Sequence, residues 1–367
     1  MIPKLKPVGW ESTEGGVRVV LDPRASVELA DADGAVTRLL ELLAEGGRSI
    51  PELAGALARS HPGSSESDLA VAIEALDGLY LVEDERRMGG LSEAERLRHF
   101  SNLAFFRTFT NLEASAEDVV RKLRASHVLV LGVGGLGSNV LQNLCGLGVG
   151  RLTLVDRDVV EARNFARQFV YRHRDIGRIK VERAAEWVRE FDPTIEVDAI
   201  QTEFTSAEDV AELVNSVRPD AVSDAVDSPN DIDMWVNAAC VAAEVPFCRG
   251  GMYVTESIIW SVDPGRSACL ICHQASENDA ANLRLHLSGL HASAVPRINR
   301  GAGPVATQLA SLVSFELTRF LTGFTPPAYA GAVAVIDLAS DCGQTIVRAD
   351  RNPDCPVCGE AALGRRP

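Results

Sequence analysis

The sequence predicts an α/β fold: a Rossmann-like, doubly wound and mostly parallel sheet, preceded by a small winged-helix-like α+β domain. Three observations lead to this prediction. An apolar, β-branched run at 128–131 is followed by a glycine-rich turn, an apolar helical stretch and a second strand at 152–155. Strand and helix patterns then continue to alternate to about residue 224. The first 88 residues instead combine short strands with three short amphipathic helices.

The totals of the sequence narrow the class of protein. With 36 basic and 51 acidic residues among 367, the chain carries a net charge of −15, which argues against nucleic acid as a partner. It has no apolar run of about 20 residues, so we expect no membrane span. The first 16 residues lack the apolar core of a secretory signal, and we expect a cytoplasmic protein. Eight cysteines in such a chain indicate metal binding or catalysis rather than disulfides.

Residues 1–88 are expected to form a recognition domain. Its predicted strands are 17–21, 26–29 and 80–82, and its predicted helices are 35–43, 49–58 and 65–79. Winged-helix domains often read DNA, but this one is rich in acids, so it favours a peptide or protein ligand. Residues 89–110 read as a linker and a helix whose phenylalanines form a core or a dimer face, and residues 111–367 as the nucleotide-binding domain.

The glycine-rich turn predicts a phosphate site. Glycines let the backbone approach phosphates, and a helix N-terminus supplies free N–H groups and a positive dipole. Asp156, at the end of the second strand, is placed to reach ribose hydroxyls. The alternative is a tight turn in a sheet that binds no ligand. The residues of the predicted loop are Gly132, Gly134, Gly135, Leu136 and Gly137.

Two groups of charged residues follow. Between 163 and 183 seven basic residues face two acids, a local inversion that polyphosphate binding explains, the alternative being a solvated helix face. Asp224 and Asp227 end the strand predicted at 221–224, where open α/β sheets bind ligands. Asp227 is suited to hold Mg²⁺ through one carboxylate, unless both acids only cap the next helix. The basic residues are Arg163, Arg167, Arg172, Arg174, Arg178, Lys180 and Arg183.

Two Cys-x-x-Cys pairs, Cys269/Cys272 and Cys355/Cys358, predict a closed structural Zn²⁺ site that joins distant segments. A redox pair is the alternative, but neither pair is expected to open a helix after a strand. The polar stretch 273–300 reads as a loop, in which His286 and His291 are weaker catalytic candidates. A helix is predicted at 303–322 and a strand at 333–337.

Together these motifs resemble the ThiF/MoeB/ubiquitin-activating-enzyme superfamily of ATP-dependent adenylating enzymes, over about residues 98–359. The resemblance implies that the glycine loop and Asp156 bind ATP, that Asp227 serves Mg²⁺, and that the four cysteines bind Zn²⁺. It also implies a homodimer. The other residues that the resemblance assigns to the nucleotide site are Asp158, Asn164, Arg167, Gln168, Lys180 and Asp224.

The sequence departs from the family pattern in two places. Ser101 stands where relatives often carry an arginine that reaches the partner's ATP site, so that Arg98 or Arg107 substitutes for it or the contact is lost. No cysteine is placed for thioester transfer, because Cys240 and Cys248 fall in predicted buried elements. Chemistry that stops at the adenylate, or passes it directly to a nucleophile, is therefore favoured.

The N-terminal domain resembles the precursor-recognition domain of microcin-type peptide-adenylating enzymes. We therefore expect ATP-dependent adenylation of a carboxylate on a ribosomally synthesised precursor peptide, with Asn164, Arg167, Lys180 and Asp227 acting on the phosphates and Mg²⁺. One alternative is adenylation of the C-terminal Gly-Gly of a ubiquitin-like sulfur carrier. Others are a non-catalytic scaffold that presents a leader peptide, and an NAD-dependent oxidoreductase, which would leave the basic residues and cysteine pairs unexplained.

Overall fold

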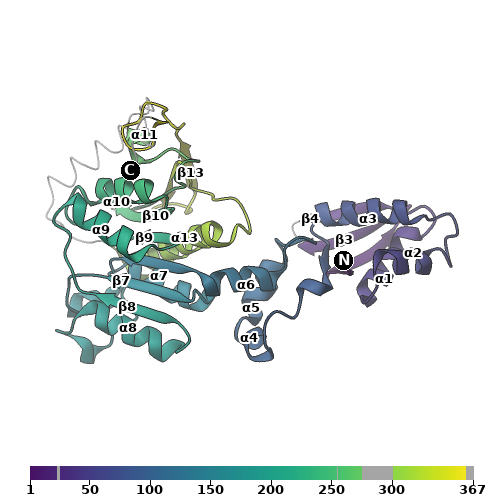
Figure 1. The fold of residues 1–367 in the computed structure, drawn as a ribbon, viewed down its shortest axis with the longest axis horizontal. Helices are drawn as coiled ribbons and strands as arrows, with labels where there is room; N and C mark the ends of the chain where they lie inside the picture. The colour runs from purple at the N-terminus through teal and green to yellow at the C-terminus, as the bar shows by residue number, and fades with distance from the viewer. Residues whose placement is uncertain (23–24, 254, 275–300, 361–367) are drawn as a thin grey trace. The chain divides into compact units, whose positions relative to one another are not determined.

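The structure is a computed structural model that describes residues 1–22, 25–253, 255–274 and 301–360 (Figure 1). The chain divides into two compact units, residues 1–122 and 123–367. Helix α6 (Ala116–Ala125) contains the boundary between them. The narrower recognition domain of residues 1–88 stays a prediction.

The first unit packs three helices against small sheets. Strands β2, β3 and β4 form one antiparallel sheet in that order, and β1 pairs with β5. Val17 and Val19 of β3 are buried against leucines of the helices, which form the core of this unit. Strands β1 and β2 are additions to the predicted elements. The bounds are β1 (Pro3–Leu5), β2 (Gly9–Thr13), β3 (Gly16–Asp22), β4 (Ala25–Ala30), α1 (Ala35–Glu45), α2 (Ile50–Leu57), α3 (Glu66–Gly78), β5 (Val82–Asp84), η1 (Glu85–Arg87), α4 (Glu93–Arg98) and α5 (Phe100–Arg107).

The second unit is built on one sheet with the strand order β13-β12-β11-β10-β9-β6-β7-β8. The strands from β8 to β10 run parallel, and β11, β12 and β13 continue the sheet antiparallel. This arrangement confirms the mostly parallel α/β fold. The strands are β6 (His127–Leu131), β7 (Arg151–Val155), β8 (Glu196–Ile200), β9 (Ala221–Asp224), β10 (Phe247–Tyr253), β11 (Glu256–Val262), β12 (Ala332–Asp337) and β13 (Gln344–Arg348).

Helices cover both faces of this sheet (Figure 1). Helix α13 packs on α7 and on β10, whereas α9 and α10 pack on each other and bury a second apolar layer against β6 and β9. No helix in the described ranges is long and apolar enough to cross a membrane. The helices are α7 (Gly137–Leu147), η2 (Ala162–Ala166), η3 (His173–Asp175), α8 (Lys180–Phe191), α9 (Ala207–Val217), α10 (Ile232–Ala243), α11 (Leu270–Gln274) and α13 (Gly303–Thr322).

Candidate nucleotide site and cysteine cluster

The order of the strands reverses between β6 and β9, which makes this the topological switch point of the parallel sheet. The chain runs from β6 to β7 and β8 on one side, then returns to add β9 on the other side of β6. In open parallel sheets ligands bind at the carboxyl ends of the strands at such a point. Residues 132, 156 and 225 directly follow the ends of β6, β7 and β9. The predicted loop and acids therefore meet at one edge of the sheet.

The glycine loop needs glycine at two positions where a Cβ would meet backbone atoms, Gly132 and Gly137, and at a third, Gly135, a Cβ would meet the side chain of Arg167. Gly132 has φ +85°, and a Cβ there would lie 2.8 Å from the carbonyl oxygen of Ala225. A Cβ on Gly137 would lie 1.8 Å from the carbonyl oxygen of Gly132, and one on Gly135 would lie 2.6 Å from Nε of Arg167. Gly134 is not required in this way, because its Cβ would meet only Gln168 at 3.9 Å. The loop is thus a tight backbone cradle.

The cradle leads into the N-terminus of α7, which no side chain among the described residues caps. Asn139, in the first turn of α7, donates to the carbonyl oxygens of Gly135 (2.7 Å) and Arg167 (2.8 Å), and the hydroxyl of Tyr171 donates to that of Val133 (2.7 Å). The sequence analysis missed Asn139 and Tyr171. Buried polar residues opening an otherwise apolar helix were the signal for Asn139.

Two further predicted residues, Asp156 and Lys180, lie at the two ends of the segment that joins β7 to α8. Asp156 accepts hydrogen bonds from the backbone N–H groups of Val133 (2.9 Å) and Asp158 (2.8 Å), which ties the glycine loop to the end of β7. Lys180 begins α8, and its Nζ lies 2.8 Å from Oδ2 of Asp158. The Lys180 side chain is 6% exposed, whereas that of Asp158 is 53% exposed. The lysine is thus held in place by an acid that solvent reaches.

The short helix η2 and the residues after it carry three predicted site residues. Asn164 lies in η2, and Arg167 and Gln168 follow it directly. Asn164 is buried and accepts from the backbone N–H of Glu161 (2.8 Å). Among the described residues, Nε of Arg167 and Oε1 of Gln168 are buried without a hydrogen-bond partner. Burial lowers the pKa of Arg167, and the carboxylate of Asp227 acts in the opposite direction. Unpartnered polar atoms beside a glycine cradle fit a polar ligand such as a nucleotide.

Asp224 is engaged by an arginine that the sequence analysis missed. It ends β9, is 1% exposed, and pairs in register with Arg249 on β10, whose Nη1 lies 3.2 Å from its Oδ1. Burial raises the pKa of Asp224 to about 7, against the opposing effect of Arg249. Nη2 of Arg249 lies 3.0 Å from Oδ1 of Asp233. Asp227, three residues after Asp224, is exposed.

The seven basic residues between 163 and 183 differ in exposure and in their contacts. Arg163, Arg172, Arg174 and Arg178 are exposed, and Arg163 lies against Glu161. Arg183 approaches Asp175. Of the seven, the described structure places Arg167 at the glycine loop and Lys180 against Asp158, which follows β7.

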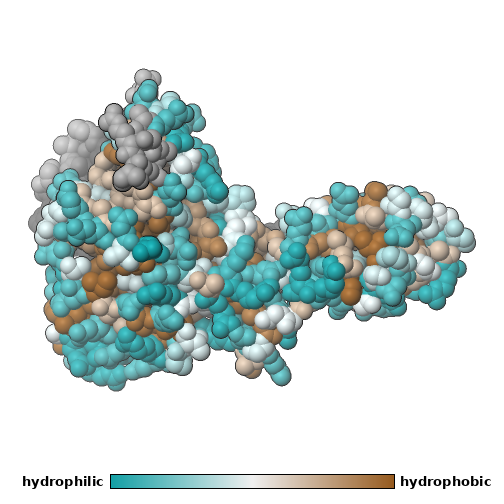
Figure 2. Space-filling view, viewed as in Figure 1, coloured by the Kyte–Doolittle hydropathy of each residue, from teal (hydrophilic) through white to brown (hydrophobic). Residues whose placement is uncertain are grey.

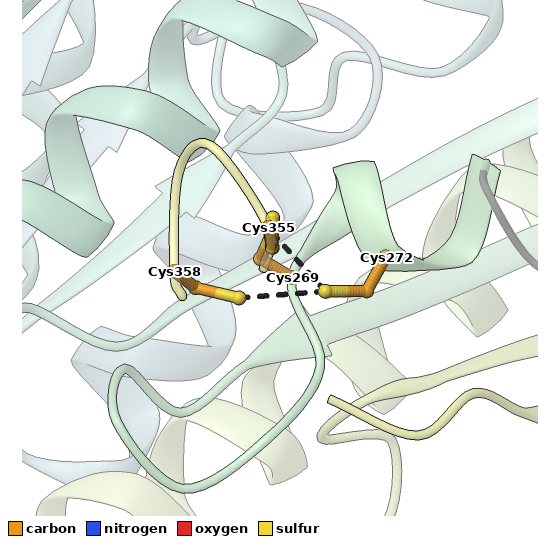
Figure 3. Close-up of side chains that lie close together, drawn as sticks. All are labelled: Cys269, Cys272, Cys355 and Cys358. Atoms are coloured by element: carbon orange, nitrogen blue, oxygen red, sulfur yellow. Dashed lines mark hydrogen bonds between the residues drawn. The ribbon is translucent and has the colours of Figure 1, made fainter. Parts of the chain in front are cut away.

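The four cysteines meet in one buried cluster (Figure 3). The Sγ–Sγ distances are 3.9 Å for Cys269–Cys272, 3.7 Å for Cys269–Cys355 and 3.4 Å for Cys272–Cys358. Burial raises the pKa of Cys355, but backbone N–H donors at Cys358 and Val357 lower it to about 7. The cluster can hold a metal ion. Contrary to expectation, the first pair does open a helix, because α11 begins directly after Cys269.

The other candidates are placed as follows. Cys240 and Cys248 are buried, as predicted, and burial raises the pKa of both thiols. Ser101 is exposed, and Nε of Arg107 lies 3.3 Å from Oε2 of Glu83 within the first unit. His286 and His291 lie outside the described residues.

The loop, the uncapped helix and the acidic strand ends define a Rossmann-type nucleotide-binding protein. The sequence model of the ThiF family matches residues 107–357, and the chain belongs to this family. It is 30% identical to the molybdopterin-synthase adenylyltransferase of Escherichia coli over 277 residues, which cover 74% of this chain and 100% of that protein. It is also 30% identical to the sulfur carrier protein ThiS adenylyltransferase of E. coli, over 68% of this chain and 92% of that protein.

Solved structures of E. coli MccB, a microcin C7 biosynthetic enzyme, share the fold at 20% identity. The TM-score is 0.79, and the match covers 98% of this chain and 97% of MccB. These comparisons confirm the family resemblance and the class of enzyme, an ATP-dependent adenylyltransferase.

Proposed function

We propose that this enzyme adenylates a carboxylate of a ribosomally synthesised precursor peptide. The observation that carries the proposal is the extent of the match to MccB, which includes the N-terminal unit and covers 98% of this chain. The family model, in contrast, begins at residue 107. MccB has been solved with ATP and with the peptide MccA. The N-terminal unit is the part that a peptide-directed enzyme needs in addition to the nucleotide site.

The proposed reaction requires placement and charge neutralisation. A carboxylate oxygen of the peptide attacks the α-phosphorus of ATP, the bond from this phosphorus to the bridging oxygen breaks, and pyrophosphate leaves. A carboxylate is already ionised near pH 7, so the site needs no general base. Backbone N–H groups of the glycine loop position the phosphates, and Arg167 and Lys180 offset the charge that develops on the α-phosphate and on pyrophosphate. Mg²⁺ held by Asp227 would neutralise phosphate charge.

The fate of the adenylate follows from the cysteines. Cys240 and Cys248 are buried in the second unit, so neither presents an accessible thiol to an adenylate. Cys342 is exposed, but it lies between β12 and β13, at the end of the strand order away from β6 and β9. We therefore propose that the product is the acyl adenylate itself, or the product of direct attack on it by another nucleophile.

The cysteine cluster supports a structural Zn²⁺ site. Tetrahedral zinc with Zn–S bonds of about 2.3 Å separates its sulfurs by about 3.8 Å. Three of the Sγ–Sγ separations, 3.4 to 3.9 Å, are close to that value, and all four sulfurs lie within 4.8 Å of one another. The site would join α11 to the segment after β13. Both segments are more than 100 residues from the glycine loop in the sequence. A structural rather than catalytic role follows, because four protein ligands leave no open position.

The peptide is proposed to bind the β4 edge of the first unit, as an added strand. Val27 and Leu29 of β4 are half-buried and can line pockets for alternate side chains, whereas β2 at the other edge is almost wholly exposed. Val71 on α3 is 65% exposed. Figure 2 shows apolar residues on the surface of this unit over β3 and α3.

Matched proline variants at the two edges test this placement. The backbone N–H of Asp31 donates to the carbonyl oxygen of Gly15. This bond sets the alternation of the ladder, so that the N–H groups of Ala30 on β4 and Ser12 on β2 point outward. Ala30→Pro should weaken binding of the precursor peptide to the full chain, and Ser12→Pro should not. Equal loss in both variants would reject the β4 edge.

ATP–pyrophosphate exchange tests the activity, with and without candidate precursor peptides. Peptide-dependent exchange supports the proposal, and Asp227→Asn and Arg167→Ala should abolish the exchange while leaving peptide binding intact. Asp231→Asn and Arg163→Ala, exposed neighbours with the same charges, serve as controls. Retained exchange in either site variant would contradict its assignment. Tight peptide binding without any exchange would instead indicate the presenting scaffold.

The sulfur-carrier reaction is the second candidate. It is favoured by the 30% identity to the adenylyltransferases for molybdopterin synthase and ThiS. Exchange that depends on a carrier protein ending in Gly-Gly, and not on a precursor peptide, would select it.

We also propose a homodimer. Leu97 and Phe100 of α4 and α5 are 79% and 71% exposed, an apolar surface that a second copy could cover. Light scattering should give twice the chain mass of 39.4 kDa, and Leu97→Ser with Phe100→Ser should lower it. A monomer at micromolar concentration would refute this.

A further inference from the structure

We propose that Arg249 is a positioning residue for the segment 225–231, which carries Asp227. The inference rests on the proposed function in one respect, since it takes Asp227 as the residue that serves the metal–nucleotide site. Its structural basis is independent of that role. Arg249 binds the chain before, within and after this segment.

Three contacts anchor the segment. At its start, Nη1 of Arg249 lies 3.2 Å from Oδ1 of Asp224, the last residue of β9. The same Nη1 donates to the carbonyl oxygen of Val226, the residue before Asp227. At the far end, Nη2 lies 3.0 Å from Oδ1 of Asp233, in the first turn of α10. One guanidinium therefore joins the strand, the loop and the helix.

The arginine itself is buried between two strands. It lies in the middle of β10, between β9 and β11, and is 8% exposed. Trp260 is the residue of β11 that pairs with Arg249. The guanidinium carbon of Arg249 lies 5.9 Å from the centre of the Trp260 ring. A planar fork with five donors can serve several acceptors at once, which the single ammonium of a lysine does less well. The contacts thus transmit the geometry of the sheet to a loop.

The same contacts separate the roles of the paired acids. Asp224 is buried, and its Oδ1 pairs with Arg249. Asp227, in contrast, is exposed at the carboxyl edge of the sheet. Outer-shell groups that orient a metal ligand commonly change metal affinity by about 10- to 100-fold when they are removed. Arg249 acts on Asp227 in this way, through the backbone of Val226.

The experiment compares Arg249→Gln with Arg319→Gln in the full chain. Arg319 is a matched control, because it also pairs with a buried acid of this unit, Glu316 at 3.1 Å, but lies on α13. Arg249→Lys and Asp233→Asn are milder variants, and Asp233→Asn leaves the pair with Asp224 in place. The readouts are amide hydrogen exchange of residues 225–231, and Mn²⁺ binding in the presence of ATP by electron paramagnetic resonance.

Arg249→Gln should speed exchange of residues 225–231 by about tenfold or more and weaken Mn²⁺ binding by about tenfold or more. Arg249→Lys and Asp233→Asn should give intermediate values, and they carry the test if Arg249→Gln does not fold. Arg319→Gln should change neither readout. Unchanged exchange in the Arg249 and Asp233 variants, with only a lower melting temperature, would overturn the proposal. Absent Mn²⁺ binding in the wild-type protein would refute the role of Asp227, and the exchange comparison would still decide the role of Arg249.

Discussion

Gly137 provides the sharpest test of the nucleotide site. An added Cβ would lie 1.8 Å from the carbonyl oxygen of Gly132 and 2.9 Å from its carbonyl carbon. Since a carbon–oxygen contact needs about 3.3 Å or more, the first turn of α7 must move by about 1.5 Å from the start of the loop. Both atoms of Gly132 belong to the backbone, so no side-chain rotation relieves the overlap. Gly137→Ala therefore deforms the phosphate cradle itself.

The expected magnitude follows from this displacement. A misplacement of about 1 Å can cost about 100-fold in a site that depends on placement. We expect the Kd for ATP with Mg²⁺ to rise by about 100-fold, which corresponds to about 2.7 kcal/mol. Overpacking of this kind should also lower the free energy of unfolding by about 1–3 kcal/mol.

Gly146→Ala is the matched control in the same helix. In the part of the chain that the structure describes, no atom outside the helix lies within 4 Å of a Cβ at Gly146. Alanine there should stabilise the helix by about 0.5–1 kcal/mol and leave ATP binding unchanged. Isothermal titration with ATP, together with urea unfolding, measures both quantities. An unchanged Kd and unfolding free energy for Gly137→Ala would refute the assignment of this turn as the phosphate cradle.

Three further predictions concern charge, metal and pH. Lys180→Met should raise the Kd for ATP by about tenfold or more, because it removes a positioned cation, whereas Met at the exposed Arg178 should not; titration calorimetry compares the two. The purified chain should contain one metal ion, and Cys355→Ser should lose it together with thermal stability while Ser at the exposed Cys342 should not; elemental analysis and melting curves decide this. Burial lowers the pKa of His127 below 6.5, so the unfolded chain binds a proton that the folded protein excludes, and stability falls as pH falls below about 6.5. His127→Gln should remove this part of the pH dependence, and parallel slopes for both proteins in urea unfolding from pH 5 to 8 would show the reasoning wrong.

The elements with strong local patterns were predictable from the sequence. The run at 128–131 is wholly buried in β6, and the following helix ends at Gly148, whose φ of +85° suits glycine. The helices predicted at 206–217 and 303–322 correspond closely to α9 and α13. In each case burial periodicity or a capping residue acts within a few residues of the chain, so no knowledge of distant partners is needed.

Elements without such a pattern were missed. The residues of β2 are exposed at four of its five positions, so no apolar alternation marks it as a strand. Strand β10 runs through Gly250 and Gly251, two residues that a strand pattern disfavours. A Cβ on Gly250 would lie 2.8 Å from Leu136 and 3.0 Å from Leu309. That glycine reflects the packing of the strand against other segments, which is a tertiary cause.

By itself, the sequence determined the α/β class, the glycine loop, the family and the four clustered thiols, because these depend on short spacings and on residue chemistry. The tertiary structure decided which of the two paired acids is engaged by an arginine, Asp224, and which is exposed, Asp227. Arg249 is 25 residues from Asp224 in the chain, and only the pairing of β9 with β10 brings the two into register. The fold likewise decided that Arg167 lies beside the glycine loop and that four arginines of the same basic segment face solvent, namely Arg163, Arg172, Arg174 and Arg178. Contacts between strands distant in sequence depend on sheet topology, which local patterns do not encode.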